Sequence, residues 1–393
     1  MKKIALSFCI LLAVFSFSSC TKNSPGTPIN NDTTGNHITN PINYIVPTTY
    51  NFTTVNYSSQ TILIAMADQI VAKINTANSV PNTPVTAATL ESMFTNTGAP
   101  FNDSALNLNG SGLNLSSYCT AAMRTDMQNY FDSIEVYSQL VPGASTGIAG
   151  VDSSSQNHSK KYLLSPNGVF YSQVVKKTIM GLFAYQVANV YMADSINTTT
   201  DTVVLAHYWD AAFGFFGVPV NFPTNLTGLK YFGSYCNQVN AGLNSNSSIM
   251  NAFLKGRAAI SNNDLPTMKA EATILIATFD SLDAAAIVQE MHETEANMAA
   301  ASGSDTVASY GTLSESLGFV RNLQYNTGKR VITAAQITQL LALYDNTTPA
   351  SPNLYNFVTI LSGQTPGPSS NTEIIAQFIG NIYGFNTTEL ALL

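Results

Sequence analysis

The chain has 393 residues, a formal net charge of −7 at neutral pH and only 10% charged side chains. An acidic chain without a basic patch argues against nucleic acid as a partner, because phosphate backbones are bound by clustered Lys and Arg side chains. The length is sufficient for one large hydrophobic core or for two fused halves.

The first twenty residues have the pattern of a lipoprotein signal. A basic start at residues 1–3 precedes a mostly apolar run over residues 4–17, which is too short to cross a bilayer as a helix. Small residues then precede Cys20, as in a bacterial lipobox. We predict a signal peptide over residues 1–19 and a stable lipid anchor on Cys20, since each buried methylene of an acyl chain adds ~0.8 kcal/mol. The alternative is an ordinary cleaved signal that happens to precede a cysteine.

The segment after the predicted anchor differs in composition from the rest of the chain. Residues 20–44 carry few large apolar side chains and many Asn, Thr, Pro and Gly residues. Such a composition is typical of a flexible linker. We therefore expect residues 20–44 to tether a single folded domain, residues 45–393, to the membrane.

The remaining chain has the hydrophobic periodicity of helices. From residue 58 onward, apolar side chains recur at three- and four-residue steps, and there is no convincing strand pattern. We expect an all-α fold of about ten helices. The predicted helices cover residues 58–74, 85–94, 115–140, 168–194, 203–217, 231–243, 249–261, 266–301, 305–325, 333–345 and 372–383. The Gly-, Ser- and Asn-rich residues 143–168 form a long connection that is either a lid over a site or disordered.

The most distinctive stretch is the aromatic segment 207–217, which contains the only Trp of the chain. In a helix, His207 and Asp210 lie one turn apart on one face, with Cβ atoms roughly 5–6 Å from each other. Such a pair can bind one metal ion or form a hydrogen-bonded acid/base pair. The alternative is a packing element in which aromatic rings and small residues admit a neighbouring helix: Trp209, Phe213, Gly214 and Gly217.

A second helix repeats this spacing with His292 and Glu295. Facing helices that each supply a His and a carboxylate are typical of metal sites in helical bundles, which hold Fe, Mn or Zn. We predict one metal site with Arg257 and Arg321 as counter-charges and these ligands: His207, Asp210, His292, Glu295 and Glu315. The alternatives are a solvated helix face at residues 292–295 and a buried ion pair between Glu315 and Arg321. The protease motif HExxH is absent, which argues against a zinc peptidase.

Four segments resemble the DUF4856 lipoproteins of Bacteroidetes, a likeness that extends from about residue 45 to the end of the chain. The segments are Tyr57-Ser58-Ser59-Gln60-Thr61 and residues 207–217, 255–260 and 313–319. That family is in turn similar to the imelysin-like group, which has two fused helical bundles and is associated with iron uptake. A His-x-x-Glu motif is thought to matter in that group. Its counterpart here is His207-x-x-Asp210, in which Asp is one methylene shorter.

The resemblance implies a function as well as a fold. We expect a non-enzymatic, outer-membrane-anchored binding protein for iron or haem acquisition, with iron or another divalent metal as its cofactor. One alternative is a metal-dependent hydrolase that uses the face of His207 and Asp210. Another is a glycan- or peptide-binding lipoprotein that works beside an outer-membrane transporter. Thr21-Lys22-Asn23-Ser24 lacks the acidic cluster of surface-exported lipoproteins, which favours the periplasmic face over the cell surface.

Two chemical modifications are also predicted. An Asp, then Ser or Thr, then an apolar residue resembles the O-glycosylation acceptor motif of Bacteroidetes, and the loop-adjacent acceptors are Ser104, Thr202 and Thr306. Cys119 and Cys236, the two cysteines after Cys20, form either one disulfide or two buried free thiols.

Overall fold

The computed structural model describes residues 43–79, 83–102, 105–140, 143–153, 160–300, 306–344 and 352–393. The predicted signal peptide, Cys20 and most of the predicted linker lie outside the described residues. Helices dominate the described part, which confirms the predicted all-α class. In chain order they are α1 (Ser58–Asn75), α2 (Ala87–Thr95), α3 (Ala121–Ser138), α4 (Tyr171–Tyr185), α5 (Thr202–Phe216), α6 (Phe232–Gln238), α7 (Asn240–Leu243), α8 (Ser245–Ser261), α9 (Leu265–Ala300), α10 (Val307–Tyr325), α11 (Ala334–Leu343), α12 (Leu354–Ser362), α13 (Asn371–Tyr383) and α14 (Thr387–Leu392).

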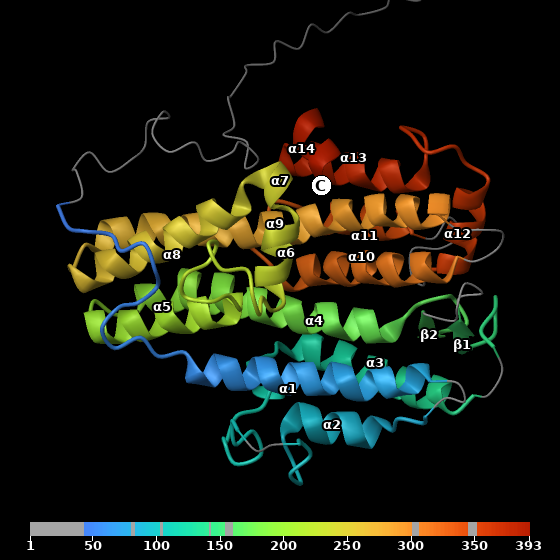
Figure 1. Ribbon diagram of the computed structural model, residues 1–393, viewed down its shortest axis with the longest axis horizontal. Coiled ribbons are helices and arrows are strands. Elements are labelled where there is room, and N and C mark those ends of the chain that lie inside the picture. Colours follow the sequence, from blue (N-terminus) through green and yellow to red (C-terminus); the bar gives the residue numbers. More distant parts are fainter. Residues whose placement is uncertain are drawn as a thin grey trace, which may run out of the picture.

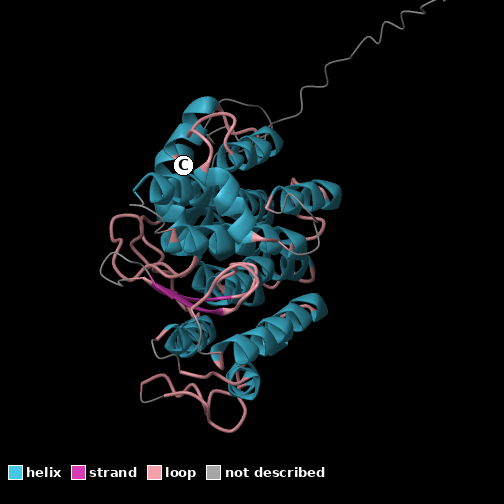
Figure 2. Ribbon diagram, turned by 90° about the vertical axis from the view of Figure 1, so that its right-hand side faces the viewer, coloured by secondary structure: helices cyan, strands magenta, loops and turns pink. Residues whose placement is uncertain are grey.

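The long helices lie side by side along the long axis of the molecule (Figure 1). Helix α9 has 36 residues and is therefore about 54 Å long at 1.5 Å per residue. Helices α8 and α5 lie at one end of the stack, and α10, α11 and α13 lie beside the other half of α9. The view along the stack shows helices α1 and α2 covering one side and the C-terminal helices covering the other (Figure 2). One continuous hydrophobic core joins both ends.

The helix ends follow local sequence signals. The Asp201 carboxylate accepts a hydrogen bond from the Val203 amide and caps α5, which ends at Gly217 in the left-handed conformation. Asp264 caps the start of α9 through Thr267, and Pro266 stands in the first turn, where its missing amide hydrogen costs nothing. Thr333 and Gln336 form a reciprocal capping box at α11.

Four local features differ from the sequence-based expectation. The connection over residues 143–168 contains an antiparallel hairpin of β1 (Gly150–Ser153) and β2 (Lys161–Leu164), although no strand was predicted. These strands are too short for an alternating pattern to be detected. The helix predicted over residues 168–194 changes to a π-helix at Gln186–Asp194. Helices α12 and α14 form in segments where we predicted none.

Cys119 and Cys236 are free, buried thiols, so the disulfide alternative is wrong. Burial raises the pKa of each thiol to about 12. Among the described residues, none of the helices has the length and apolarity needed to cross a membrane.

Candidate functional site

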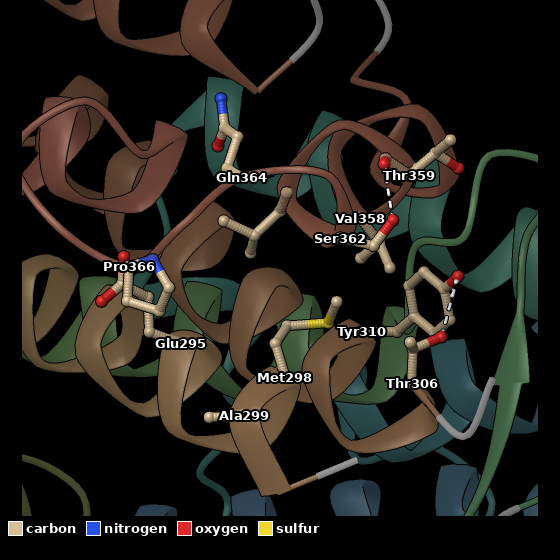
Figure 3. Close-up of a pocket in the computed structure, with 11 residues that line it drawn as sticks. Glu295, Met298, Ala299, Thr306, Tyr310, Val358, Thr359, Ser362, Gln364 and Pro366 are labelled. Carbon is tan, nitrogen blue, oxygen red and sulfur yellow. Dashed lines mark hydrogen bonds between the residues drawn. The ribbon is translucent and has the colours of Figure 1, made fainter. Parts of the chain in front are cut away.

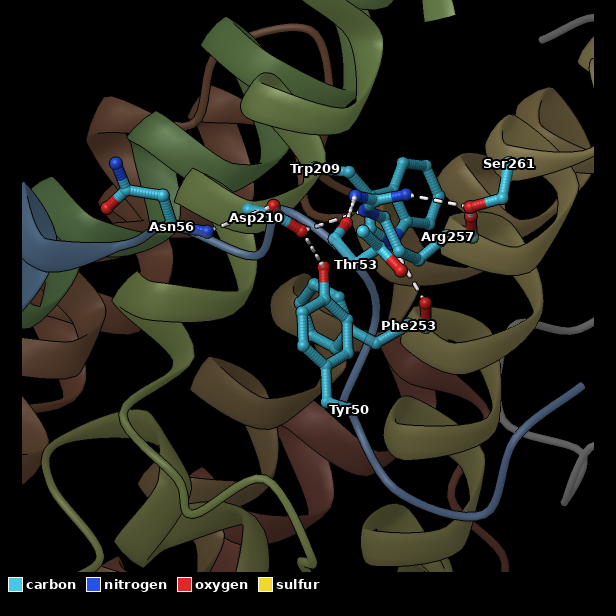
Figure 4. A network of polar contacts seen from close by, with 8 residues as sticks. All are labelled: Tyr50, Thr53, Asn56, Trp209, Asp210, Phe253, Arg257 and Ser261. Carbon is cyan, nitrogen blue, oxygen red and sulfur yellow. Dashed lines mark hydrogen bonds and ion pairs between the residues drawn. The ribbon is translucent and has the colours of Figure 1, made fainter. Parts of the chain in front are cut away.

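Asp210 lies at the centre of a closed polar network (Figure 4). Its Oδ1 atom accepts hydrogen bonds from the Tyr50 hydroxyl at 2.8 Å and from Arg257 Nε at 2.9 Å. Its Oδ2 atom accepts a hydrogen bond from the backbone amide of Asn56 at 3.2 Å. The side chains of Asp210 and Arg257 are 1% and 3% exposed, which makes this a buried ion pair with satisfied acceptors.

The tryptophan of the same segment packs against α8. The indole N–H of Trp209 donates to the Phe253 carbonyl oxygen at 2.9 Å. A Cβ atom on Gly256 would lie 1.9 Å from the Trp209 ring, so only glycine admits the indole at this position. The segment 255–260 therefore provides both the space for Trp209 and the arginine for Asp210.

The other predicted packing residues of α5 contact α1 and the following loop. A Cβ atom on Gly214 would lie 2.5 Å from the Cβ atom of Tyr57, just before α1, and 2.8 Å from that of Gln60 in α1, which shows how closely the start of α1 approaches. The Phe213 ring stacks on Tyr50 with centroids 3.7 Å apart. Gly217 adopts φ +76, a conformation that favours glycine, and ends the helix.

His207 and Asp210 do not form a site together. His207 is exposed, whereas Asp210 points into the network with Arg257. The two residues lie on either side of the boundary between the exposed and buried faces of α5. The predicted His–Asp pair is therefore wrong, and the packing alternative describes this segment.

The structure also separates the other predicted metal ligands. His292 lies 3.5 Å from Glu373 at the surface, and Glu295 accepts hydrogen bonds from Ser370 and Thr372. Glu315 pairs with a lysine, described below. Among the described residues, there is no group of three or more His, Cys, Asp or Glu side chains that could hold a metal ion. The predicted five-ligand metal centre is therefore not assembled.

The remaining predicted residues have separate surroundings. Arg321 donates to Gln324 at 3.4 Å and does not pair with Glu315. Thr202 begins α5 and is partly exposed, and the Thr306 hydroxyl lies 3.5 Å from the Tyr310 hydroxyl. Ser104 lies outside the described residues.

A cavity of about 500 Å³ lies between α9, α10 and α12 (Figure 3). Its walls combine Met298 and Val358 with polar side chains such as Tyr310 and Gln364. The carboxylate of Glu295, which also lines this cavity, accepts hydrogen bonds from the hydroxyl groups of Ser370 and Thr372. The charged group of this cavity is therefore already satisfied by the protein.

A second buried ion pair lies between α4 and α10. Lys177 is fully buried, and its ammonium lies 2.5 Å from Glu315 Oε2. The same ammonium donates to the Tyr235 hydroxyl at 2.6 Å and lies over the rings of Tyr235 and Phe319. A Cβ atom on Gly318 would lie 2.6 Å from the Lys177 Cβ atom. Glu315, Gly318 and Phe319 of the segment 313–319 thus all serve to accommodate this lysine.

Glu290 of α9 extends this pair into a larger cluster. The Tyr235 hydroxyl lies 2.8 Å from Glu290 Oε1 and 2.6 Å from Glu315 Oε2. Because a hydroxyl has one proton, it cannot donate to both carboxyl groups. Burial and the charge of Glu315 raise the pKa of Glu290 well above its ordinary value. We therefore assign a proton to Glu290, which donates to Tyr235, which in turn donates to Glu315.

The two carboxyl groups of the cluster have opposite electrostatic surroundings. Burial favours the neutral form of Glu315, but the ammonium of Lys177, the hydrogen bond from Tyr235 and the charge of Lys176 together outweigh burial and lower the pKa of Glu315 below its usual value. Glu290 has no such partner, and its Oε2 atom is buried without a hydrogen bond among the described residues. A buried polar atom without a partner is unusual and requires an explanation.

The cluster forms the floor of a polar cavity of about 450 Å³. The cavity is lined by Asp68, Lys176, Leu229, Lys230, Tyr231, Ser234, Tyr235, Gln238, Glu290, Glu293 and Glu315. Lys230 and Asp68 form an exposed ion pair at 2.8 Å on its rim. Burial, together with the charge of Lys177, lowers the pKa of Lys176. This cavity combines shape, charge and an unsatisfied polar group, and we take it as the candidate site.

Sequence reasoning identified Glu315 but missed Lys177, Tyr235 and Glu290 as its partners. The available signal was the pair Lys176-Lys177 within an otherwise apolar helix. A lysine is almost never fully buried unless it is paired, so this position predicts an acidic partner on a neighbouring helix.

A family model matches most of the chain. The family model described as "Domain of unknown function (DUF4856)" matches residues 47–385. No curated protein and no solved structure matches the chain. Since the family model covers most of the sequence, the chain belongs to the DUF4856 family.

Proposed function

We propose that this protein is a non-enzymatic, lipid-anchored binding protein of the outer membrane that holds a small polar ligand in the cavity above Glu290. The lipobox-like segment ending at Cys20 supports the anchor. The observation that carries the binding role is the buried Glu290 Oε2 atom, which has no hydrogen-bond partner among the described residues and belongs to a residue that lines the cavity. A bound ligand with hydrogen-bond donors would satisfy this group.

This proposal keeps the predicted binding role and changes the ligand. Iron or haem was expected, but the expected metal ligands are occupied by other contacts. A polar organic nutrient fits the lining of the cavity better, because hydroxyl, amide and carboxyl groups converge there. The natural continuation of such a role is transfer of the ligand to an outer-membrane transporter.

The test compares ligand binding with the cavity open and filled. Ser234 lines the cavity on α6, so Ser234→Trp would fill it, while Thr273→Trp on the exposed face of α9 is the control. Thermal unfolding of the full-length protein in detergent would be followed with amino acids, dipeptides, oligosaccharides, ferric iron, zinc and haem. A ligand at 100 times its Kd stabilises the folded state by about 2.7 kcal/mol.

We expect one organic class to raise the melting temperature of the wild type and of the control, but not of Ser234→Trp. Binding of iron, zinc or haem that Ser234→Trp leaves unchanged would refute the proposal, because it would place the binding site elsewhere. An absence of any stabilisation across the panel would also refute it.

A further inference from the structure

We infer that the ligand of this cavity is a zwitterionic amino compound, a free amino acid or a short peptide, with its ammonium at Glu290 and its carboxylate at Lys176. This inference rests on the proposed function, because it names the class of ligand for the same site.

Several charged side chains in and beside the cavity lining already have partners within the protein. Lys177 pairs with Glu315 on the floor, and Lys230 pairs with Asp68 on the rim. Glu293 accepts a hydrogen bond from Gln289 at 3.2 Å. After these pairs are removed, one base and two acids of the cavity lining have no ion-pair partner: Lys176, Glu290 and Glu293. Of the two acids, Glu290 is buried, whereas Glu293 is exposed to solvent.

Glu290 and Lys176 require partners of opposite charge. Glu290 is 3% exposed, and its Oε2 atom accepts no hydrogen bond among the described residues. An ammonium group has three donors and would satisfy this oxygen when the carboxyl group of Glu290 turns toward the cavity, since Oε2 is enclosed in the free protein. Lys176 makes no ion pair within the described part of the chain and offers donors to a carboxylate. A ligand that carries both groups complements both residues.

The volume and the remaining walls of the cavity suit a small polar compound. A volume of about 450 Å³ lies within the range of roughly 300–1,000 Å³ that is typical of small-molecule sites. Tyr231, Ser234 and Gln238 supply hydroxyl and amide groups along the wall, which suit the backbone of an amino acid or short peptide. The lining contains only one aliphatic side chain, Leu229, so the site recognises the polar backbone more than an apolar side chain.

Binding of an ammonium ligand changes the protonation of Glu290. The carboxyl group of Glu290 holds a proton in the free protein, and an ammonium ligand binds its carboxylate form. The ammonium of the ligand binds at Oε2, and its positive charge favours the carboxylate form, so the proton on Oε1 leaves Glu290 for the solvent while no bond of the ligand is made or broken. A neutral sugar would bind without this release. The titratable and charged groups that face Glu290 are Asp68 on α1, Lys176 and Lys177 on α4, Tyr235 on α6, Glu293 on α9, Glu315 on α10 and Tyr344 after α11.

Calorimetry of the full-length protein in detergent tests this inference. The probes are the twenty proteinogenic L-amino acids and alanyl-alanine, followed by the N-acetylated and C-terminally amidated forms of the tightest binder. Each titration is run in phosphate and in Tris buffer, whose different ionisation heats reveal proton release. We expect release approaching one proton for the zwitterion, and affinities at least tenfold lower for both blocked forms.

Variants separate the two ends of the ligand. Glu290→Gln should abolish proton release, and Lys176→Gln should weaken the free zwitterion more than its amidated form. Lys269→Gln, on the exposed side of α9, should leave both unchanged. The circular dichroism spectrum confirms that each variant is folded.

Three results would overturn the inference, and they differ in what they imply. An oligosaccharide that binds without proton release, and is excluded by Ser234→Trp, would refute the amino-compound class and leave the proposed function intact. Equal affinities for the zwitterion and both blocked forms would also refute the class. If no organic probe binds the wild type, both the class and the proposed function are wrong.

Discussion

The two buried ion pairs of this protein are built in a similar way. Asp210 with Arg257 and Glu315 with Lys177 each join two helices, and each depends on a glycine that admits a close neighbour. An aromatic ring also flanks the cation in both pairs. They differ in completeness, since the acceptors of Asp210 are satisfied, whereas the second pair adjoins Glu290, whose Oε2 atom is not.

This difference separates a structural network from a candidate site. A buried network that satisfies its own polar groups leaves nothing for a ligand to supply, whatever its sequence motif suggests. A network beside a cavity that leaves one acceptor unsatisfied offers a ligand a group to bind. The aromatic segment 207–217 is the more conspicuous in sequence, but the segment 313–319 leads to the site.

The largest effect is expected at the closed network. Arg257→Met leaves the buried carboxylate of Asp210 without its counter-charge, which should reduce the free energy of unfolding by about 3–5 kcal/mol. Urea unfolding monitored by circular dichroism measures this loss. The double variant Asp210→Asn/Arg257→Met should recover part of it, because no uncompensated charge remains. A loss below about 1 kcal/mol would show that this pair does not hold α5 against α8.

A smaller, pH-dependent effect is expected at the open cluster. The pKa of Glu290 is raised above its ordinary value of 4.5, so the folded state holds a proton that the unfolded state releases. Stability from this group is complete below pH 4.5 and is lost as pH rises toward the folded pKa. Each unit of pKa difference corresponds to about 1.4 kcal/mol. Glu290→Gln cannot titrate, so its stability should decrease less than that of the wild type as pH rises.

Urea unfolding of both proteins from pH 5 to pH 8 measures this divergence. Burial also raises the pKa of Glu271 and of Asp280 to about 7, but these groups titrate in both proteins and cancel in the difference. Glu91→Gln on α2, a helix that contributes no residue to the cavity lining, controls for the removal of one acidic side chain. Parallel profiles for the wild type and Glu290→Gln would contradict the assignment of a proton to Glu290.

Much of the helical fold was predictable, because periodicity is a local property. The predicted helix over residues 266–301 is α9 (Leu265–Ala300), and the one over residues 305–325 is α10 (Val307–Tyr325). The hairpin of β1 and β2 was missed because each strand has only four paired residues, too few for an alternating pattern to stand out in the sequence. The π-helix at Gln186–Asp194 was missed because the same apolar pattern suits either helix type.

The site was less predictable, because a charged residue finds its partner through helix packing. Glu315 was predicted to be a metal ligand, with an ion pair to Arg321 on its own helix as the alternative, but it pairs with Lys177 on α4 instead. The spacing of His207 and Asp210 was read correctly as one helical turn. The spacing of two residues in the sequence does not show where the boundary between the buried and the exposed face of α5 lies.

That boundary leads to the smallest expected effect. Three residues along a helix turn the side chain by about 300°, so His207 and Asp210 point about 60° apart, enough to leave one exposed and bury the other. His207→Ala should therefore change the free energy of unfolding by no more than about 0.5 kcal/mol, as for Lys269→Ala on the exposed side of α9. Urea unfolding of the two variants tests this equivalence. A destabilisation above 1 kcal/mol, or a loss of ligand binding, would restore the pair as a functional unit and remove the distinction between the closed network and the open cavity.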